Sequence, residues 1–174
     1  MSGLYDWFAY LSSRWDLVAT TLIETLFYVL TVTIAAAAVS IATGVLTRRR
    51  ALAREFSLAI ASVFVTVPSL ALFTIFIPVV GLGFWPSFIA LFLYAILPIL
   101  RNTVTGLQSV DASVVESARG MGMTRWQILY KVELPLAWPV ILAGIRVSAM
   151  LTVGISAIAT LVAGGGLGDF IKSG

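Results

Sequence analysis

The chain has 174 residues, of which 60% are hydrophobic and only 11% are charged, and its net charge is +3. A soluble domain of this length needs more charged side chains to cover its surface, so the composition predicts a protein that lies in a bilayer. Cys and His are both absent, which excludes disulfides and thiolate metal sites and removes the commonest general base. The basic residues are too few and too scattered for a nucleic-acid surface. The composition therefore argues against an enzyme, a catalytic site and a metal site.

The first 16 residues are rich in aromatic side chains. Leu4, Phe8, Leu11 and Trp15 recur at helical spacing, which predicts a short interfacial helix over residues 1–16 with its aromatic rings at headgroup level. A partly disordered aromatic tail is the alternative. The segment lacks the basic region and the long apolar run of a cleaved signal peptide.

Four apolar segments follow, and we interpret them as membrane-spanning helices. Their ranges are 17–46, 56–80, 85–100 and 136–163. The uncharged part of the first, residues 25–46, would be about 33 Å long as a helix, which is enough to cross the hydrocarbon. Between the third and the fourth lies a polar loop, residues 101–135. The expected fold is therefore an all-α polytopic membrane bundle.

Basic residues set the expected orientation of these spans. They gather in two alternate loops, as Arg48, Arg49, Arg50 and Arg54 in the first and as Arg101, Arg119, Arg125 and Lys131 in the second. The positive-inside rule places both loops in the cytoplasm. The N-terminus and the final segment "GGGLGDFIKSG" are then predicted outside.

The polar loop is too long and too well patterned for a plain connection. Asp111 is a suitable N-cap for a helix that runs through Arg119. Gly120 and Gly122 are predicted to break that helix, since glycine adopts backbone angles that other residues resist.

A second helix is predicted after this turn. Thr124 can cap it, it would end near Glu133, and Pro135 would prevent its simple continuation into the fourth span. The result is a helix-turn-helix with an apolar side. That side could lie against lipid or insert into a groove on a cytoplasmic partner.

The spacing of residues in this loop carries a family resemblance. Glu116-Ser117-Ala118 is followed after three residues by Gly122, and nine further residues lead to Val132, Glu133 and Leu134-Pro135. This pattern resembles the EAA loop of bacterial ABC importer permeases, with Ser117 in place of an Ala and Val132 in place of an Ile. The resemblance implies that the loop holds coupling helices that dock on an ATPase subunit. The residues it assigns to coupling are Glu116, Ser117, Ala118, Gly120, Gly122, Leu134 and Pro135.

Other segments narrow the resemblance to one subgroup. The stretches "VPSLALFTIFIPVVGLG", "IALFLYAILPILRNTVTGL", "ARGMGMTRWQILYKVELPLAWPVILAGIR" and "AGGGLGDFI" resemble permeases for glycine betaine, carnitine, choline and related osmoprotectants, with a methionine-importer-like type I fold. That family implies a bacterial inner-membrane protein. Its partners would be an ATPase, a second copy or a homologous permease, and an extracellular or periplasmic substrate-binding protein. Members usually continue past the GGLGD segment into another transmembrane helix, so we expect this sequence either to be shortened there, which is the favoured interpretation, or to lack that helix.

ATP hydrolysis is expected in a separate chain, because no GxxxxGK[ST] motif occurs here. No cofactor is expected in this chain, while ATP and Mg²⁺ would be bound by the partner ATPase. Two alternatives to the osmoprotectant importer stay open. One is an ABC importer for another small solute such as an amino acid, and the other is a membrane scaffold or channel that needs no ATPase.

Two groups of residues could line a translocation pathway. Pro68-Ser69 lies inside the second predicted span, where a proline break could line a path or simply form a packing kink. In the fourth span, small and polar residues recur every four positions, as Gly144, Ser148, Thr152, Ser156 and Thr160. This stripe could line a path, although tight helix packing, including a dimer contact, is the favoured interpretation.

Two charges and several aromatic residues complete the candidates. Arg146 and Glu24 are the charges nearest to membrane depth, and each is predicted to snorkel to its own interface. A quaternary ammonium is typically bound by an aromatic cage. The aromatic residues of the second and third spans show no clear cage pattern, and we interpret them as belt or core residues.

Overall fold

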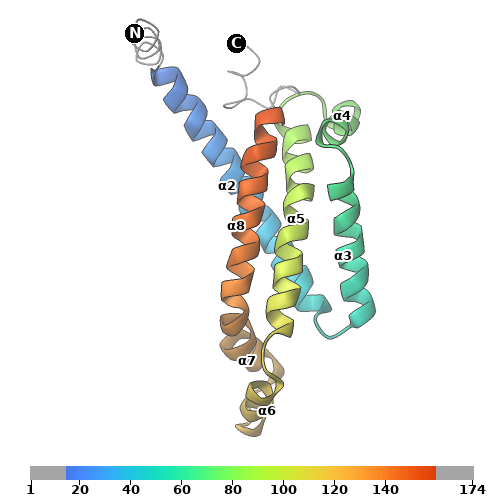
Figure 1. Ribbon diagram of the computed structural model, residues 1–174, viewed down its shortest axis with the longest axis vertical. Helices are drawn as coiled ribbons and strands as arrows, with labels where there is room; N and C mark the ends of the chain where they lie inside the picture. Colours follow the sequence, from blue (N-terminus) through green and yellow to red (C-terminus); the bar gives the residue numbers. More distant parts are fainter. Residues whose placement is uncertain (1–14, 160–174) are drawn as a thin grey trace, which may run out of the picture.

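The computed structural model describes residues 15–159, and this part of the chain contains helices and no strands (Figure 1). The elements in chain order are α2 (Trp15–Thr47), α3 (Ala51–Thr66), α4 (Ser69–Val80), α5 (Phe84–Gln108), α6 (Ala112–Gly120), α7 (Arg125–Ile128), a π-helical turn (Leu129–Glu133) and α8 (Leu134–Ala159). Three helices of the described part are long and apolar enough to cross a membrane, over residues 18–47, 84–108 and 125–159. The predicted all-α membrane bundle is confirmed. The predicted interfacial helix falls almost entirely outside the described residues, as do Thr160 and the end of the chain.

Helix α5 forms the centre of the bundle. It contacts α8, α2, α3 and α4, and Figure 1 shows it between α8 and α3 with α2 crossing at an angle. Its buried residues include Ala90, Leu91 and Ala95, which pack in one core with Val32 of α2 and Phe73 of α4. The small side chains of Ala90 and Ala95 let the helices approach closely, as is usual for helices packed in a membrane.

The second predicted span, residues 56–80, is a broken pair of helices in the structure. It is divided into α3 and α4, whose axes are bent by 97°. The residue before the proline, Val67, is extended with φ −74° and ψ 131°, because the proline ring disfavours helical angles there. Tyr94 of α5 donates a hydrogen bond from its hydroxyl to the Val67 carbonyl. Pro68 and Ser69 thus mark a corner after α3, whereas the sequence predicted a kink inside one span.

Two helix ends also differ from prediction. Helix α5 continues to Gln108, so the first eight residues of the predicted polar loop extend this helix. The expected stop at Pro135 is wrong, since residues 125–159 form one continuous helical segment. The π turn explains this: the Leu134 N–H donates to the Leu129 carbonyl, which widens the helix where Pro135 lacks a donor.

Candidate functional site: a helical hairpin at the basic end of the bundle

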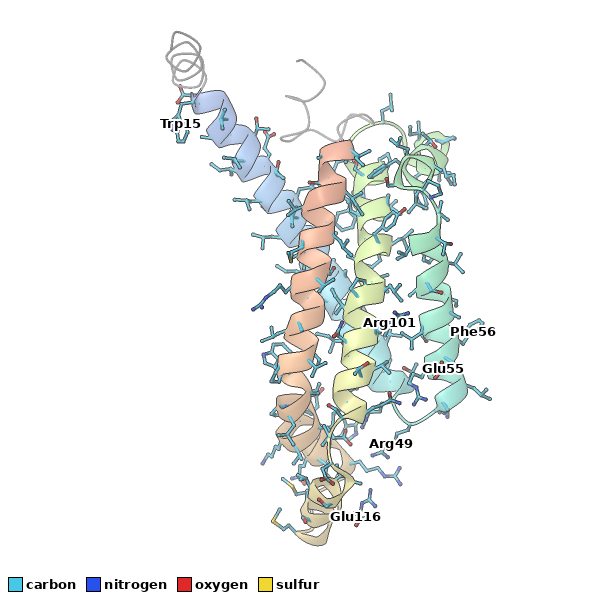
Figure 2. The ribbon with its side chains drawn as sticks, viewed as in Figure 1. Trp15, Arg49, Glu55, Phe56, Arg101 and Glu116 are labelled. Atoms are coloured by element: carbon cyan, nitrogen blue, oxygen red, sulfur yellow. The ribbon has the colours of Figure 1, made fainter. Side chains whose placement is uncertain are left out.

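Helices α6 and α7 and the π turn form a hairpin, residues 111–133, that projects beyond one end of the bundle (Figure 1). We call this unit the polar hairpin, and the end of the bundle from which it projects the basic end. Figure 2 shows Arg49 and Glu116 toward this same end. The α2–α3 connection, with its arginines, therefore lies on the same side of the bundle as the polar hairpin.

The first helix of the polar hairpin begins as predicted at Asp111. The carboxylate of Asp111 accepts a hydrogen bond of 2.8 Å from the Ser113 N–H. This bond to the backbone favours the charged form and lowers the pKa of the Asp111 carboxyl below its ordinary value. An aspartate at this position satisfies an amide that the helix leaves without a partner.

The turn depends on one glycine, whereas the sequence predicted two. Gly122 has φ +81°, in the left-handed region, and Gly120 is the last residue of α6. Two turn hydrogen bonds surround Gly122: its own N–H donates to Arg119 O at 3.0 Å, and the Met123 N–H donates to Ala118 O at 3.2 Å. The left-handed angle is the one that glycine adopts without steric cost.

The second helix begins with a reciprocal pair of side chains. The Gln127 N–H donates to the Thr124 hydroxyl, and the Thr124 N–H donates to the Gln127 side-chain oxygen at 2.8 Å. The predicted cap at Thr124 is therefore confirmed. Sequence reasoning missed Gln127, although its place three residues after a threonine is the usual signal of a capping box.

The buried residues of the polar hairpin are Ala118, Ile128 and Leu129. Helix α6 contacts α7 and the π turn, so these side chains close the hairpin on itself. Ala118 is only 2% exposed within this single chain. Its own hairpin therefore covers Ala118, and the coupling role that the resemblance implies for this residue stays a prediction.

The exposed residues of the polar hairpin are mixed in chemistry. Met121, Trp126 and Tyr130 are large apolar or aromatic residues that remain exposed, and the rings of Trp126 and Tyr130 stack with centroids 6.2 Å apart. Glu116 is exposed too, and within residues 15–159 no hydrogen bond or ion pair involves its carboxylate. Ser117 and Pro135 are exposed, while Leu134 is half-buried. Of the predicted coupling residues, Ala118 is therefore buried and Leu134 half-buried, while the others are exposed.

An ion pair that the sequence did not predict joins the polar hairpin to α2. The Arg48 Nε lies 3.2 Å from the Glu133 Oε2, and the two side chains are only 17% and 15% exposed. Arg48 also donates from Nη1 to the Val45 carbonyl at 2.8 Å. The pair lines a cleft of about 120 Å³ together with Arg49 and Arg54. The only sequence signal was a charged residue placed directly before Leu134-Pro135.

The small and polar stripe of α8 faces the interior of the chain. Ser148, Thr152 and Ser156 are buried, and the Ser148 hydroxyl donates to Ala95 O of α5 at 3.0 Å. A Cβ atom at Gly144 would lie 2.6 Å from the Asn102 Cβ. These contacts agree with the interpretation as helix packing, and within the described residues the packing partner is α5. The pathway role of Ser148, Thr152 and Ser156 stays a prediction.

The charges predicted to snorkel are exposed on the surface of the bundle. Neither Arg146 nor Glu24 has an ion pair among the described residues. Arg146 lies between Leu142 and Met150 on α8, and both of these are exposed and apolar. Snorkelling stays a prediction.

The aromatic residues near the start of α5 contact one another. Phe84 stacks on Phe88, and Tyr28 of α2 packs edge-on against Phe84. Phe73 is fully buried. These contacts agree with belt and core roles. The described residues also contain no group of carboxylates that could hold a metal ion.

Comparison with known proteins identifies the family. Residues 34–174 match the model for "Binding-protein-dependent transport system inner membrane component". The chain belongs to this family. It is 47% identical over 149 residues to the carnitine transport permease protein OpuCB of Listeria monocytogenes, a match that covers 86% of this chain and 68% of that protein.

A second relative is the glycine betaine/carnitine/choline transport system permease protein OpuCB of Bacillus subtilis. It is 50% identical over 109 residues, which is 63% of this chain and 50% of that protein. Among solved structures, an inward-facing form of the MetNI methionine ABC transporter has a similar chain, with a TM-score of 0.78 and 28% identity over 91% of this chain and 80% of that one. The chain is therefore a multi-pass permease component with the fold of an ABC importer.

Proposed function

We propose that the chain is the permease subunit of an ATP-driven importer of quaternary-ammonium osmoprotectants such as glycine betaine, carnitine or choline. The observation that carries this proposal is the exposed surface of the polar hairpin, with Glu116, Met121 and Trp126. Its own caps and buried residues hold this surface in shape at the end of an apolar bundle. An exposed apolar surface of this kind fits a groove on a partner protein.

The basic end would face the cytoplasm, because arginines gather there. A separate ATPase, which binds ATP and Mg²⁺, would dock on the polar hairpin. Two permeases, either two copies of this chain or this chain and a homologue, would act with two ATPases. A binding protein on the other face of the membrane would deliver the solute.

The names of the relatives support the class of solute. Permeases for carnitine, glycine betaine and choline are 43% to 50% identical to this chain, whereas the methionine transporter is 28% identical. An amino-acid importer is the second candidate, because that methionine transporter shares the fold over most of the chain.

Reconstitution tests both candidates. The permease, its ATPase and its binding protein are placed in proteoliposomes, and uptake of labelled glycine betaine, carnitine, choline and methionine is measured with and without ATP. We expect ATP-dependent uptake of at least one quaternary ammonium and none of methionine. ATP-dependent uptake of methionine alone would support the amino-acid importer. Uptake that needs no ATP would support a channel, and failure of the ATPase to bind would support a scaffold.

A further inference from the structure

The Arg48–Glu133 ion pair connects two elements that are far apart in the sequence. Arg48 directly follows α2, and Glu133 is the last residue of the π turn. The only other ion pair of the described residues joins the neighbours Arg54 and Glu55, and the Glu55 side chain is 68% exposed. The Arg48–Glu133 pair therefore differs in both respects, since it is largely buried and bridges two elements.

Arg48 is itself held in place by the helix that precedes it. Its Nη1 donates to the Val45 carbonyl, one of the carbonyls that the end of α2 leaves without a helical partner. A cation is also favoured there, because the C-terminal end of a helix carries partial negative charge. The guanidinium is thus fixed to α2 by one contact and to the polar hairpin by the other.

Glu133 is the last residue of the π turn that joins α7 to α8 in one long helix. The π turn carries the widened hydrogen bond from Leu134 to Leu129, and Pro135 supplies no donor in the next position. Turns of this kind inside α-helices are frequently found at functional sites. Along the chain, a displacement of α7 reaches α8 through this turn, while Arg48 offers a second connection from the turn into α2.

We propose that Arg48 and Glu133 are positioning residues that make the end of α2 and the π turn move as one body. Force applied to the polar hairpin then reaches α2 as well as α8. This inference rests on the proposed function, in which an ATPase acts on the polar hairpin. Breaking one partner of a buried pair leaves an uncompensated charge, so the loss of either residue uncouples the two elements.

The test compares two single variants, Glu133→Gln and Arg48→Gln, with the exchange of both residues, Arg48→Glu with Glu133→Arg. The control is Glu55→Gln, which alters the exposed pair. Each protein is reconstituted with the ATPase and the binding protein, and solute uptake per ATP hydrolysed is measured. We expect each single variant to bind the ATPase while uptake per ATP falls about tenfold, a typical allosteric coupling factor. The double variant with both residues exchanged should recover most of the uptake per ATP. Glu55→Gln should leave the uptake per ATP unchanged.

Two results would overturn the inference while the unmodified complex transports normally. One is an unchanged uptake per ATP in both single variants. The other is a joint loss of folding and ATPase binding that the exchange does not restore, which would assign the pair to stability alone. An unmodified complex without ATP-driven uptake would instead overturn the proposed function, and this inference with it.

A second measurement uses the absence of cysteine from the chain. Arg48→Cys and Glu133→Cys are combined and joined by a short bifunctional thiol reagent. Because the proposal makes the two sites one body, cross-linking should raise the uptake per ATP of this double variant. A cross-link that stops uptake would show that the contact must open during transport, and would overturn the proposal.

Discussion

Two regions of the molecule use glycine and small hydroxyl residues for different purposes. One is the α5–α8 interface, and the other is the polar hairpin. In the interface, Gly144 and Ser148 are buried, and the missing or small side chain provides space for the neighbouring helix. In the polar hairpin, Gly122 and Thr124 are exposed, and they determine where the backbone turns. The interface is therefore sensitive to added volume, whereas the hairpin is sensitive to lost local hydrogen bonds and to backbone angle.

The largest expected effect is in the interface. Gly144→Ala places a Cβ atom 2.9 Å from the Pro98 carbonyl oxygen and 2.6 Å from the Asn102 Cβ, so the helices must separate. Overpacking of this kind costs about 1–3 kcal/mol. Thermal unfolding in detergent should show the loss.

Gly154→Ala on the same helix is the matched control. No atom lies within 4 Å of its added Cβ, and alanine is the better helix former, so stability should be equal or higher. Equal stability of both variants would contradict the claim that the interface is sensitive to added volume.

Next in size is the turn of the polar hairpin. Gly122→Val places a β-branched residue at φ +81°, which costs about 1–2 kcal/mol. Hydrogen exchange should speed up in α6 and α7 while α5 and α8 stay protected, and binding of the ATPase should weaken. Gly120→Ala is the control, because Gly120 ends a helix with open space around it. If the amide hydrogens of α6 and α7 exchange equally fast in Gly122→Val and Gly120→Ala, the turn does not need the left-handed angle.

Loss of the capping box should be smaller and more local. Thr124→Ala removes the acceptor of the Gln127 N–H, and the loss of an N-cap typically costs about 1 kcal/mol. Amide exchange should increase in α7 alone. Thr124→Ser keeps the hydroxyl, so its α7 amides should exchange at the rate of the unmodified protein. If they exchange as fast as in the alanine variant, the cap is not formed.

The smallest expected effect is the pH dependence of α6. Because the folded pKa of Asp111 lies below its ordinary value of 3.8, its cap contributes fully above that value and is lost as pH falls through the folded pKa. Exchange in the first turn of α6, corrected for its intrinsic pH dependence, should increase only in this acidic range. Asp111→Asn should remove this pH dependence of exchange. If the pH dependence persists in the variant, another titrating group causes it.

The sequence was sufficient where structure depends on neighbouring residues. The long apolar run of α2 was predicted within two residues at each end, and the caps at Asp111 and Thr124 were predicted correctly. Each of these depends on composition or on hydrogen bonds between residues two or three positions apart.

The sequence was insufficient where contacts between helices decide the outcome. Pro68 and Pro135 are the same residue type, yet one lies at a 97° corner and the other inside a continuous helix. Which side of α8 is buried depends on α5, so the direction of Ser148 could not be inferred from its spacing. The Arg48–Glu133 pair joins residues that lie in separate loops of the sequence, and no local pattern signals it.

The central claim is that the polar hairpin is the surface on which the ATPase acts. Met121→Cys in the hairpin and Leu82→Cys in the α4–α5 turn give single cysteines at side chains that are 75% and 70% exposed, in a chain that otherwise has none. Both are labelled with a thiol reagent in detergent, with and without the ATPase subunit. We expect the ATPase to slow labelling at position 121 and to leave labelling at position 82 unchanged. Labelling at position 121 that is equally fast in the assembled complex would contradict it.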